Sequence, residues 1–139
     1  MPTEIVVHAA HQGGMHVIAD AGDHSVSMDY PLAPGNAGFT PLQLLLASLA
    51  GCAAGTMVAL LRKSGQPVLG LEVNARGVRR EEHPTVFTQI ALEFVVHGTG
   101  VDQAVAGRAL SQAEQLVCPV WAMLKVSTPI AASLRFVEE

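Results

Sequence analysis

The first 61 residues of this 139-residue sequence contain no lysine or arginine. All eight basic residues follow, beginning with Arg62, and twelve acidic residues outnumber them, which gives a net charge of −4. Nucleic-acid-binding domains carry clustered basic surfaces, and anionic membranes attract basic segments. The charge balance therefore argues against both nucleic acid and a membrane surface as partners.

Aromatic and charged residues are also scarce. The chain has six aromatic residues, and only 14% of its residues are charged whereas 50% are hydrophobic. This composition excludes disorder, and the core must be built from Leu, Val and Ala. The length fits a single domain covering residues 1–139.

The N-terminal sequence shows no secretory signal. The N-terminal sequence MPTEIVVHAAH has no basic segment followed by an apolar stretch, so we expect a cytoplasmic protein. The sequence has only two cysteines. In a reducing compartment two cysteines are more often free, catalytic or metal-binding than joined in a structural disulfide.

Periodicity and turn residues predict an α+β chain in the order β-β-β-α-β-β-α-β, without the crossover repeat of a Rossmann fold. A short helical turn is expected from Pro119 to Leu124. Strands are expected at residues 3–9, 15–20, 24–30, 67–79, 86–97 and 129–137, and helices at about 40–63 and 103–117. The second helix should begin at an Asp102 cap and bury a face that includes Leu116.

The first helix is the clearest element. Thr40 and Gln43 form a T-x-x-Q capping box, and Gly65 supplies a stop. Between them the residues are apolar almost all round, which is typical of a helix that is buried or spans a membrane. The strong cap and the globular alternation of the remaining chain favour burial. One sheet can hardly cover so apolar a helix, which indicates burial between two subunits.

The two cysteines occupy different settings. Cys52 lies inside the apolar helix, where a cysteine can simply pack like alanine. Cys118 directly precedes Pro119, an N-cap-like position where free N–H groups favour the thiolate and lower its pKa. Together they could also form a redox pair, in which one thiolate becomes a sulfenic acid and the other closes a disulfide. Two cysteines without paired histidines make a poor zinc site, so we expect no metal and no cofactor.

Four segments resemble the OsmC/Ohr family, the osmotically inducible and organic hydroperoxide resistance proteins. They are GDHSVSMDYP (22–31), TPLQLLLASLAGC (40–52), REEHPTVFTQIALEFVVHG (80–98) and AEQLVCPVWAML (113–124). The GC on the apolar helix, the HP before a long strand and the CPV on the late helix resemble the OsmC-like branch most closely. The resemblance implies the OsmC-like fold, an intertwined α+β homodimer whose long central helices are buried across the interface.

The resemblance also implies a function. Family members are thiol peroxidases of the oxidative stress response, which makes Cys52 the peroxidatic thiolate and Cys118 the resolving cysteine. Organic hydroperoxides are the implied substrates, because a mostly apolar pocket favours alkyl hydroperoxides over hydrogen peroxide. The implied reductant is a thiol of the lipoyl or dithiol type.

The sequence departs from the family pattern in one respect. The characterised peroxidases use an Arg from the N-terminal strands to stabilise the thiolate and a Glu near the start of the central helix to hold that Arg. This sequence has no Arg before position 62, and the uncharged Gln43 stands at the helix start. Substitute cations could come from His11, His16 or His24, or from Arg79 or Arg80 of the partner subunit.

The missing Arg–Glu pair leaves a second hypothesis open. Without a cation, a buried Cys52 would remain a thiol and react slowly with peroxide. The chain would then be a non-catalytic OsmC-like dimer that binds an apolar small molecule at the subunit interface.

Overall fold

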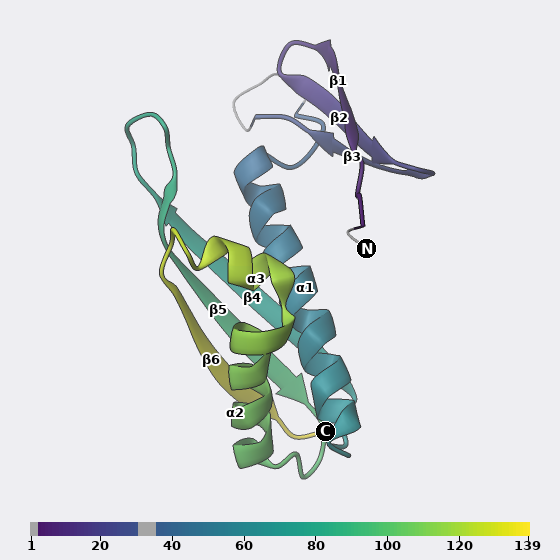
Figure 1. Ribbon diagram of the computed structural model, residues 1–139, viewed down its shortest axis with the longest axis vertical. Coiled ribbons are helices and arrows are strands. Elements are labelled where there is room, and N and C mark those ends of the chain that lie inside the picture. Colours follow the sequence, from purple (N-terminus) through teal and green to yellow (C-terminus); the bar gives the residue numbers. More distant parts are fainter. Residues whose placement is uncertain (1–2, 31–35) are drawn as a thin grey trace. The chain divides into compact units, whose positions relative to one another are not determined.

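A computed structural model describes residues 3–30 and 36–139 of the chain, which forms two compact units, Met1–Leu45 and Leu46–Glu139 (Figure 1). The predicted α+β order is confirmed, and the short helical turn expected at Pro119 is a helix of its own. The expectation of a single domain over residues 1–139 stays a prediction. The elements are β1 (His8–Gly13), β2 (His16–Ala21), β3 (His24–Met28), α1 (Pro41–Lys63), β4 (Gly70–Arg79), β5 (Phe87–His97), α2 (Gln103–Gln112), the π-helical turn η1 (Ala113–Val117), α3 (Pro119–Leu124) and β6 (Ile130–Val137).

The first unit is an antiparallel sheet in the order β1-β2-β3. The first strand begins later than the predicted residue 3, because a tight turn at Gly14 fixes the register and pairs His8 with Asp20, close to the end of β2. Residues before His8 therefore have no partner strand in this unit, and Ile5, Val6 and Val7 are exposed. Residues 31–35, between β3 and α1, lie outside the described residues.

Both ends of α1 form as predicted. The backbone N–H of Gln43 donates to Thr40 Oγ1 at 3.1 Å, and the Thr40 N–H donates to Gln43 Oε1 at 2.9 Å, which completes the capping box. At the other end, Gly65 has a φ of +74° and ends the helix in a Schellman motif. In this motif the Gly65 N–H donates to Arg62 O and the Gln66 N–H to Leu61 O.

The second unit has a three-stranded sheet covered on one face by helices (Figure 1). The central strand β5 pairs antiparallel with β4 and parallel with β6, and the connection from β5 to β6 carries α2, η1 and α3. Asp102 caps α2 as predicted, since its Oδ1 accepts from the N–H groups of Ala104 and Val105. The core lies between the helices and the inner face of β5, and its buried members are Leu49, Ala53, Met57, Leu61, Ile90, Leu92, Phe94, Val96, Ala106, Ala109, Ala113, Cys118 and Trp121.

Two local irregularities change which side chains face the core. In β5 a bulge opposite Val78 and Arg79 turns the Phe87 ring over Gly77 and toward the core. The predicted inward-facing Leu116 is instead 79% exposed. It lies in η1, and the wider π turn rotates residues away from the face they would share in an α-helix.

The long central helix is buried on only one face. Within the chain only every fourth residue is buried, at Leu49, Ala53, Met57 and Leu61. In its most apolar 18-residue window the mean hydropathy is 2.1 and only 22% of the residues are buried. By length and composition α1 could cross a membrane, a test that the core helix of a soluble protein also passes. Much of its apolar surface therefore remains uncovered by the described residues of the second unit.

Candidate active site

Cys52 lies midway along α1, on the border between the buried stripe and the uncovered face. Its side chain is half-buried and packs against the core cluster. The neighbouring Gly51 is exposed, and a Cβ added there would meet no atom within 4 Å. The sulfur is thus held by the core on one side while the adjoining helix surface stays open.

Cys118 lies at the junction of η1 and α3. Because Pro119 disfavours a helical conformation in the residue before it, the chain turns extended at Cys118, with φ −74° and ψ 108°. The Cys118 N–H closes the π turn by donating to Ala113 O at 2.9 Å. Its carbonyl accepts from the Ala122 N–H at 3.0 Å in the first turn of α3. Cys118 is therefore the N-cap of α3, as predicted.

The fold brings the two cysteines together across 66 residues of sequence. The Cys118 thiol donates a hydrogen bond to Cys52 Sγ, and the two sulfurs are 3.0 Å apart. Both are free thiols in this structure. A disulfide needs an S–S distance of about 2.05 Å, so closing the bond requires the sulfurs to approach by only about 1 Å.

Burial sets the acidity of Cys118. The residue has no exposed surface, and this burial raises the pKa of its thiol. The hydrogen bond to Cys52 raises the pKa further, while the backbone N–H groups of Trp121 and Val120 lower it. The predicted fall in the Cys118 pKa is therefore wrong, because loss of solvent outweighs the helix N-terminus.

Trp121 is a neighbour of the site that the sequence analysis did not single out. It is fully buried in α3, three residues after Cys118, and its ring stacks on Phe94 at a centroid distance of 6.0 Å. Its Nε1 has no hydrogen-bond partner among the described residues. As the only tryptophan of the chain, it offers an optical probe of the region around Cys118. The clue in the sequence was its place in the first turn after Cys118-Pro119.

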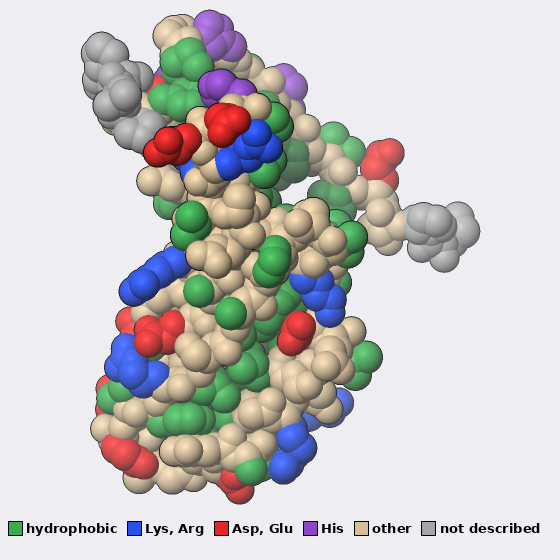
Figure 2. Space-filling model, turned by 90° about the vertical axis from the view of Figure 1, so that its left-hand side faces the viewer, with side chains coloured by type: hydrophobic (Ala, Val, Ile, Leu, Met, Phe, Trp, Pro, Cys, Tyr) green, Lys and Arg blue, Asp and Glu red, His purple; other side chains and the backbone are tan. Residues whose placement is uncertain are grey.

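Of the supporting residues proposed in the N-terminal half, all but His24 have local partners among the described residues. The Gln43 side chain is engaged in the capping box. His11 Nε2 lies 2.8 Å from Gly14 O, and His16 Nε2 lies 3.3 Å from Ser27 Oγ, whereas His24 is exposed. Figure 2 shows histidines, in purple, on the β1–β3 unit. Their roles at the site stay predictions.

The two arginines near the end of β4 also have local partners. Arg79 donates from Nη1 to the carbonyl of Arg80, and Arg80 lies 3.7 Å from Glu82. Within residues 3–30 and 36–139, no basic side chain forms a hydrogen bond or ion pair with either cysteine. The same residues contain no cluster of three His, Cys, Asp or Glu side chains that could hold a metal.

The sequence of this chain matches a known family. Residues 34–133 match the OsmC family, described as OsmC-like protein. The chain belongs to the OsmC-like family. Protein YhfA of Escherichia coli strain K12 is 34% identical to it over 120 residues, which cover 84% of this chain and 86% of YhfA.

Solved structures agree with this assignment at the level of the fold. An OsmC-like protein from Mycoplasma pneumoniae superposes with a TM-score of 0.86 at 19% identity, with 99% of each chain covered. An organic hydroperoxide resistance protein from Elizabethkingia anophelis superposes with a TM-score of 0.74 at 17% identity, covering 99% of this OsmC-like chain and 100% of that one. At these identities the likeness supports the α+β architecture alone.

Proposed function

We propose that this OsmC-like protein is a thiol peroxidase that reduces organic hydroperoxides in the cytoplasm, as part of an oxidative stress response. The observation that carries the proposal is the 3.0 Å separation of Cys52 Sγ and Cys118 Sγ. Family membership and the fold shared with hydroperoxide resistance proteins support it.

The two thiols differ in a way that suits two different roles. Cys52 is only half-buried, so its side chain is the more accessible of the two to a hydroperoxide. Cys118 is fully buried and the pKa of its thiol is raised, so it stays protonated until Cys52 has been oxidised. We therefore assign attack on the peroxide to Cys52 and resolution to Cys118.

In the first step the Cys52 thiolate attacks the terminal oxygen of the hydroperoxide and the O–O bond breaks. The departing alkoxide takes up a proton and leaves as the alcohol, while Cys52 becomes a sulfenic acid. Cys118 then gives up its proton and attacks the Cys52 sulfur, forming the disulfide and releasing water. A dithiol reductant, of lipoyl type or similar, returns the pair to two thiols and is itself oxidised to a disulfide.

A homodimer is part of the proposal, and the uncovered face of α1 supports it. Exposed small residues recur every fourth position along this face, at Ala47, Gly51, Gly55 and Ala59. A glycine inside a helix costs about 0.5–1 kcal/mol relative to alanine, yet a Cβ on either glycine would meet nothing in this chain. Close approach of the same helix from a second subunit would use those glycines and cover the apolar surface.

A second candidate function rests on a specific observation. No basic side chain of the described residues is bonded to either cysteine, and the sequence has no Arg before position 62 to take the place of the family's arginine. An OsmC-like dimer that binds an apolar small molecule at the subunit interface would need no such cation.

The test is one equivalent of cumene hydroperoxide added to reduced protein, followed by digestion without reductant and mass spectrometry. The peroxidase proposal predicts a peptide pair joined through Cys52 and Cys118, with cumyl alcohol formed in equal amount. Trp121 fluorescence followed in parallel should change with the rate at which the disulfide forms. Two unmodified thiols together with unreacted hydroperoxide would reject the peroxidase and leave the binding function.

A further inference from the structure

The outward face of the β4-β5-β6 sheet, away from the helices and the cysteines, carries a trough of short side chains. The strand register places Arg76, Ala91 and Ala131 in one row across the three strands. The next row holds Asn74, Glu93 and Ser133. Alanine is a weak strand former, so two alanines side by side on an exposed sheet are not explained by strand propensity.

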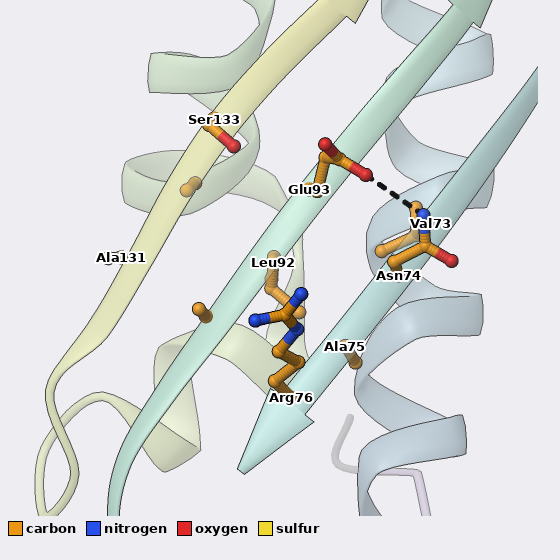
Figure 3. A pocket seen from close by; sticks show the side chains of 10 residues that line it. Val73, Asn74, Ala75, Arg76, Leu92, Glu93, Ala131 and Ser133 are labelled. Atoms are coloured by element: carbon orange, nitrogen blue, oxygen red, sulfur yellow. Dashed lines mark hydrogen bonds between the residues drawn. The ribbon is translucent and has the colours of Figure 1, made fainter.

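These short side chains leave a hollow above the strands. It encloses about 690 Å³ over both rows, with Arg76 on one side and Ser133 on the other (Figure 3). A second hollow of about 430 Å³ shares Arg76, Ala91 and Ala131 with the first. It extends toward Val78 and Pro129, so Arg76 stands between a polar end and an apolar end.

The charges in the trough are not equally available. Glu93 accepts hydrogen bonds from Asn74 Nδ2 at 3.0 Å and from Arg135 Nε at 3.4 Å, and these bonds lower the pKa of its carboxyl (Figure 3). Arg76 makes no hydrogen bond or ion pair with any described residue. The trough therefore presents one guanidinium with its donors free beside a carboxylate that is already paired.

We propose that this trough binds a small carboxylate with a short hydrocarbon chain. The carboxylate would accept two parallel hydrogen bonds from Arg76. The chain would lie over Ala91 and Ala131 toward Val78 and Pro129, where it removes apolar surface from water. An amine would be repelled by Arg76, and an alcohol would carry no charge to pair with its guanidinium.

The experiment is a titration of the full-length protein with octanoate, followed by NMR of the alanine methyl groups. Octanoate should shift Ala91 and Ala131 saturably, and 1-octanol and octylamine should bind at least tenfold more weakly. Arg76→Gln should weaken octanoate binding at least tenfold. The matched control is Arg108→Gln, which removes an exposed arginine on α2 that also lacks a partner among the described residues and should leave binding unchanged.

A second variant tests the shape of the trough independently of the charge of Arg76. Ala131→Leu keeps Arg76 but places a larger side chain on the trough floor, and it should weaken octanoate binding while far-UV circular dichroism stays unchanged. Full binding by Arg76→Gln, equal binding of 1-octanol, or shifts confined to residues outside the trough would each overturn the proposal. Because the trough lies on the opposite sheet face from the cysteines, these outcomes do not depend on peroxidase activity.

Discussion

The Cys118 thiol donates a hydrogen bond to Cys52 Sγ at 3.0 Å, although Cys52 lies within α1 and Cys118 is the N-cap of α3, 66 positions later. Cys52 is half-buried and Cys118 has no exposed surface. Burial and the bond to Cys52 keep Cys118 protonated, so the two thiols are chemically unequal. This inequality leads to the first prediction.

Iodoacetamide should alkylate Cys52 before Cys118 in the reduced native protein. Only the thiolate reacts, and burial both raises the pKa of the Cys118 thiol and shields its sulfur from the reagent, so we expect Cys118 to react severalfold more slowly near neutral pH. Peptide mass spectrometry over time measures both rates. Cys52→Ser and Cys118→Ser provide the separate rates, and faster labelling of Cys118 would contradict the assigned roles.

The stability of the second unit should fall as the pH rises above about 6.5, in part through His97. His97 Nε2 lies 2.8 Å from Glu72 Oε2 and its Nδ1 lies 2.9 Å from Glu139 Oε1, and these carboxylates raise the pKa of the imidazole above its usual 6.5. A raised folded-state pKa gives stability that is fully present below the unfolded-state pKa and is lost as the pH rises through the folded-state pKa.

Urea unfolding across this pH range tests the His97 prediction. The His97→Gln variant should show a flatter dependence of the unfolding midpoint on pH than the wild type. The control is His24→Gln, which removes an exposed histidine without a hydrogen bond to any described residue and should keep the wild-type slope. An unchanged slope in His97→Gln would show that the carboxylate pair does not act through this imidazole.

Gly98→Ala should destabilise the protein by about 1–3 kcal/mol, because a buried methyl group there has no room. An added Cβ would lie 2.3 Å from Pro67 O, a backbone atom that cannot move without shifting the entry to β4. The matched control is Gly107→Ala on α2, where a Cβ would meet nothing within 4 Å. That variant should be about 0.5–1 kcal/mol more stable than the wild type. Denaturant unfolding measures both, and equal effects would reject the steric explanation.

Gly55→Leu should weaken the proposed dimer. The substitution adds a bulky side chain to the uncovered face of α1, where nothing in the chain itself lies within 4 Å. The fold of the subunit should survive while the close approach of a second helix is blocked. Sedimentation equilibrium should show dimeric wild type and a mainly monomeric variant, whereas Gly107→Leu, on the exposed side of α2, should remain dimeric. A dimeric Gly55→Leu would place the interface elsewhere.

The local features of the fold could be predicted because their causes are local. The Thr40–Gln43 box and the Gly65 stop each depend on residues a few positions apart. The π turn before Cys118 could not be predicted, because its wider hydrogen bond depends on how the last turn of the helix meets the extended residue that Pro119 imposes. The exposure of Leu116 is a consequence of the same turn.

The residue types of the candidate site could be predicted from the sequence, but their arrangement in space could not. The chemistry of Cys52 and Cys118 follows from their residue type and from the family motifs, but their proximity depends on how α1 and α3 pack on one sheet. Burial of Cys118 is likewise a tertiary property, and it reversed the pKa shift expected from the helix N-terminus alone. The Arg76 trough depends on strand register, which alternation within a single strand does not specify.

The proposed mechanism requires the sulfur of Cys52 to attack the peroxide. The most direct measurement is the consumption of cumene hydroperoxide, without added reductant, by the wild type, Cys52→Ser and Cys118→Ser. We predict that the wild type and Cys118→Ser each consume one equivalent per chain. The first should end as the disulfide and the second as a Cys52 sulfenic acid that dimedone traps. Cys52→Ser should consume none, and consumption by this variant at the wild-type rate would contradict the account.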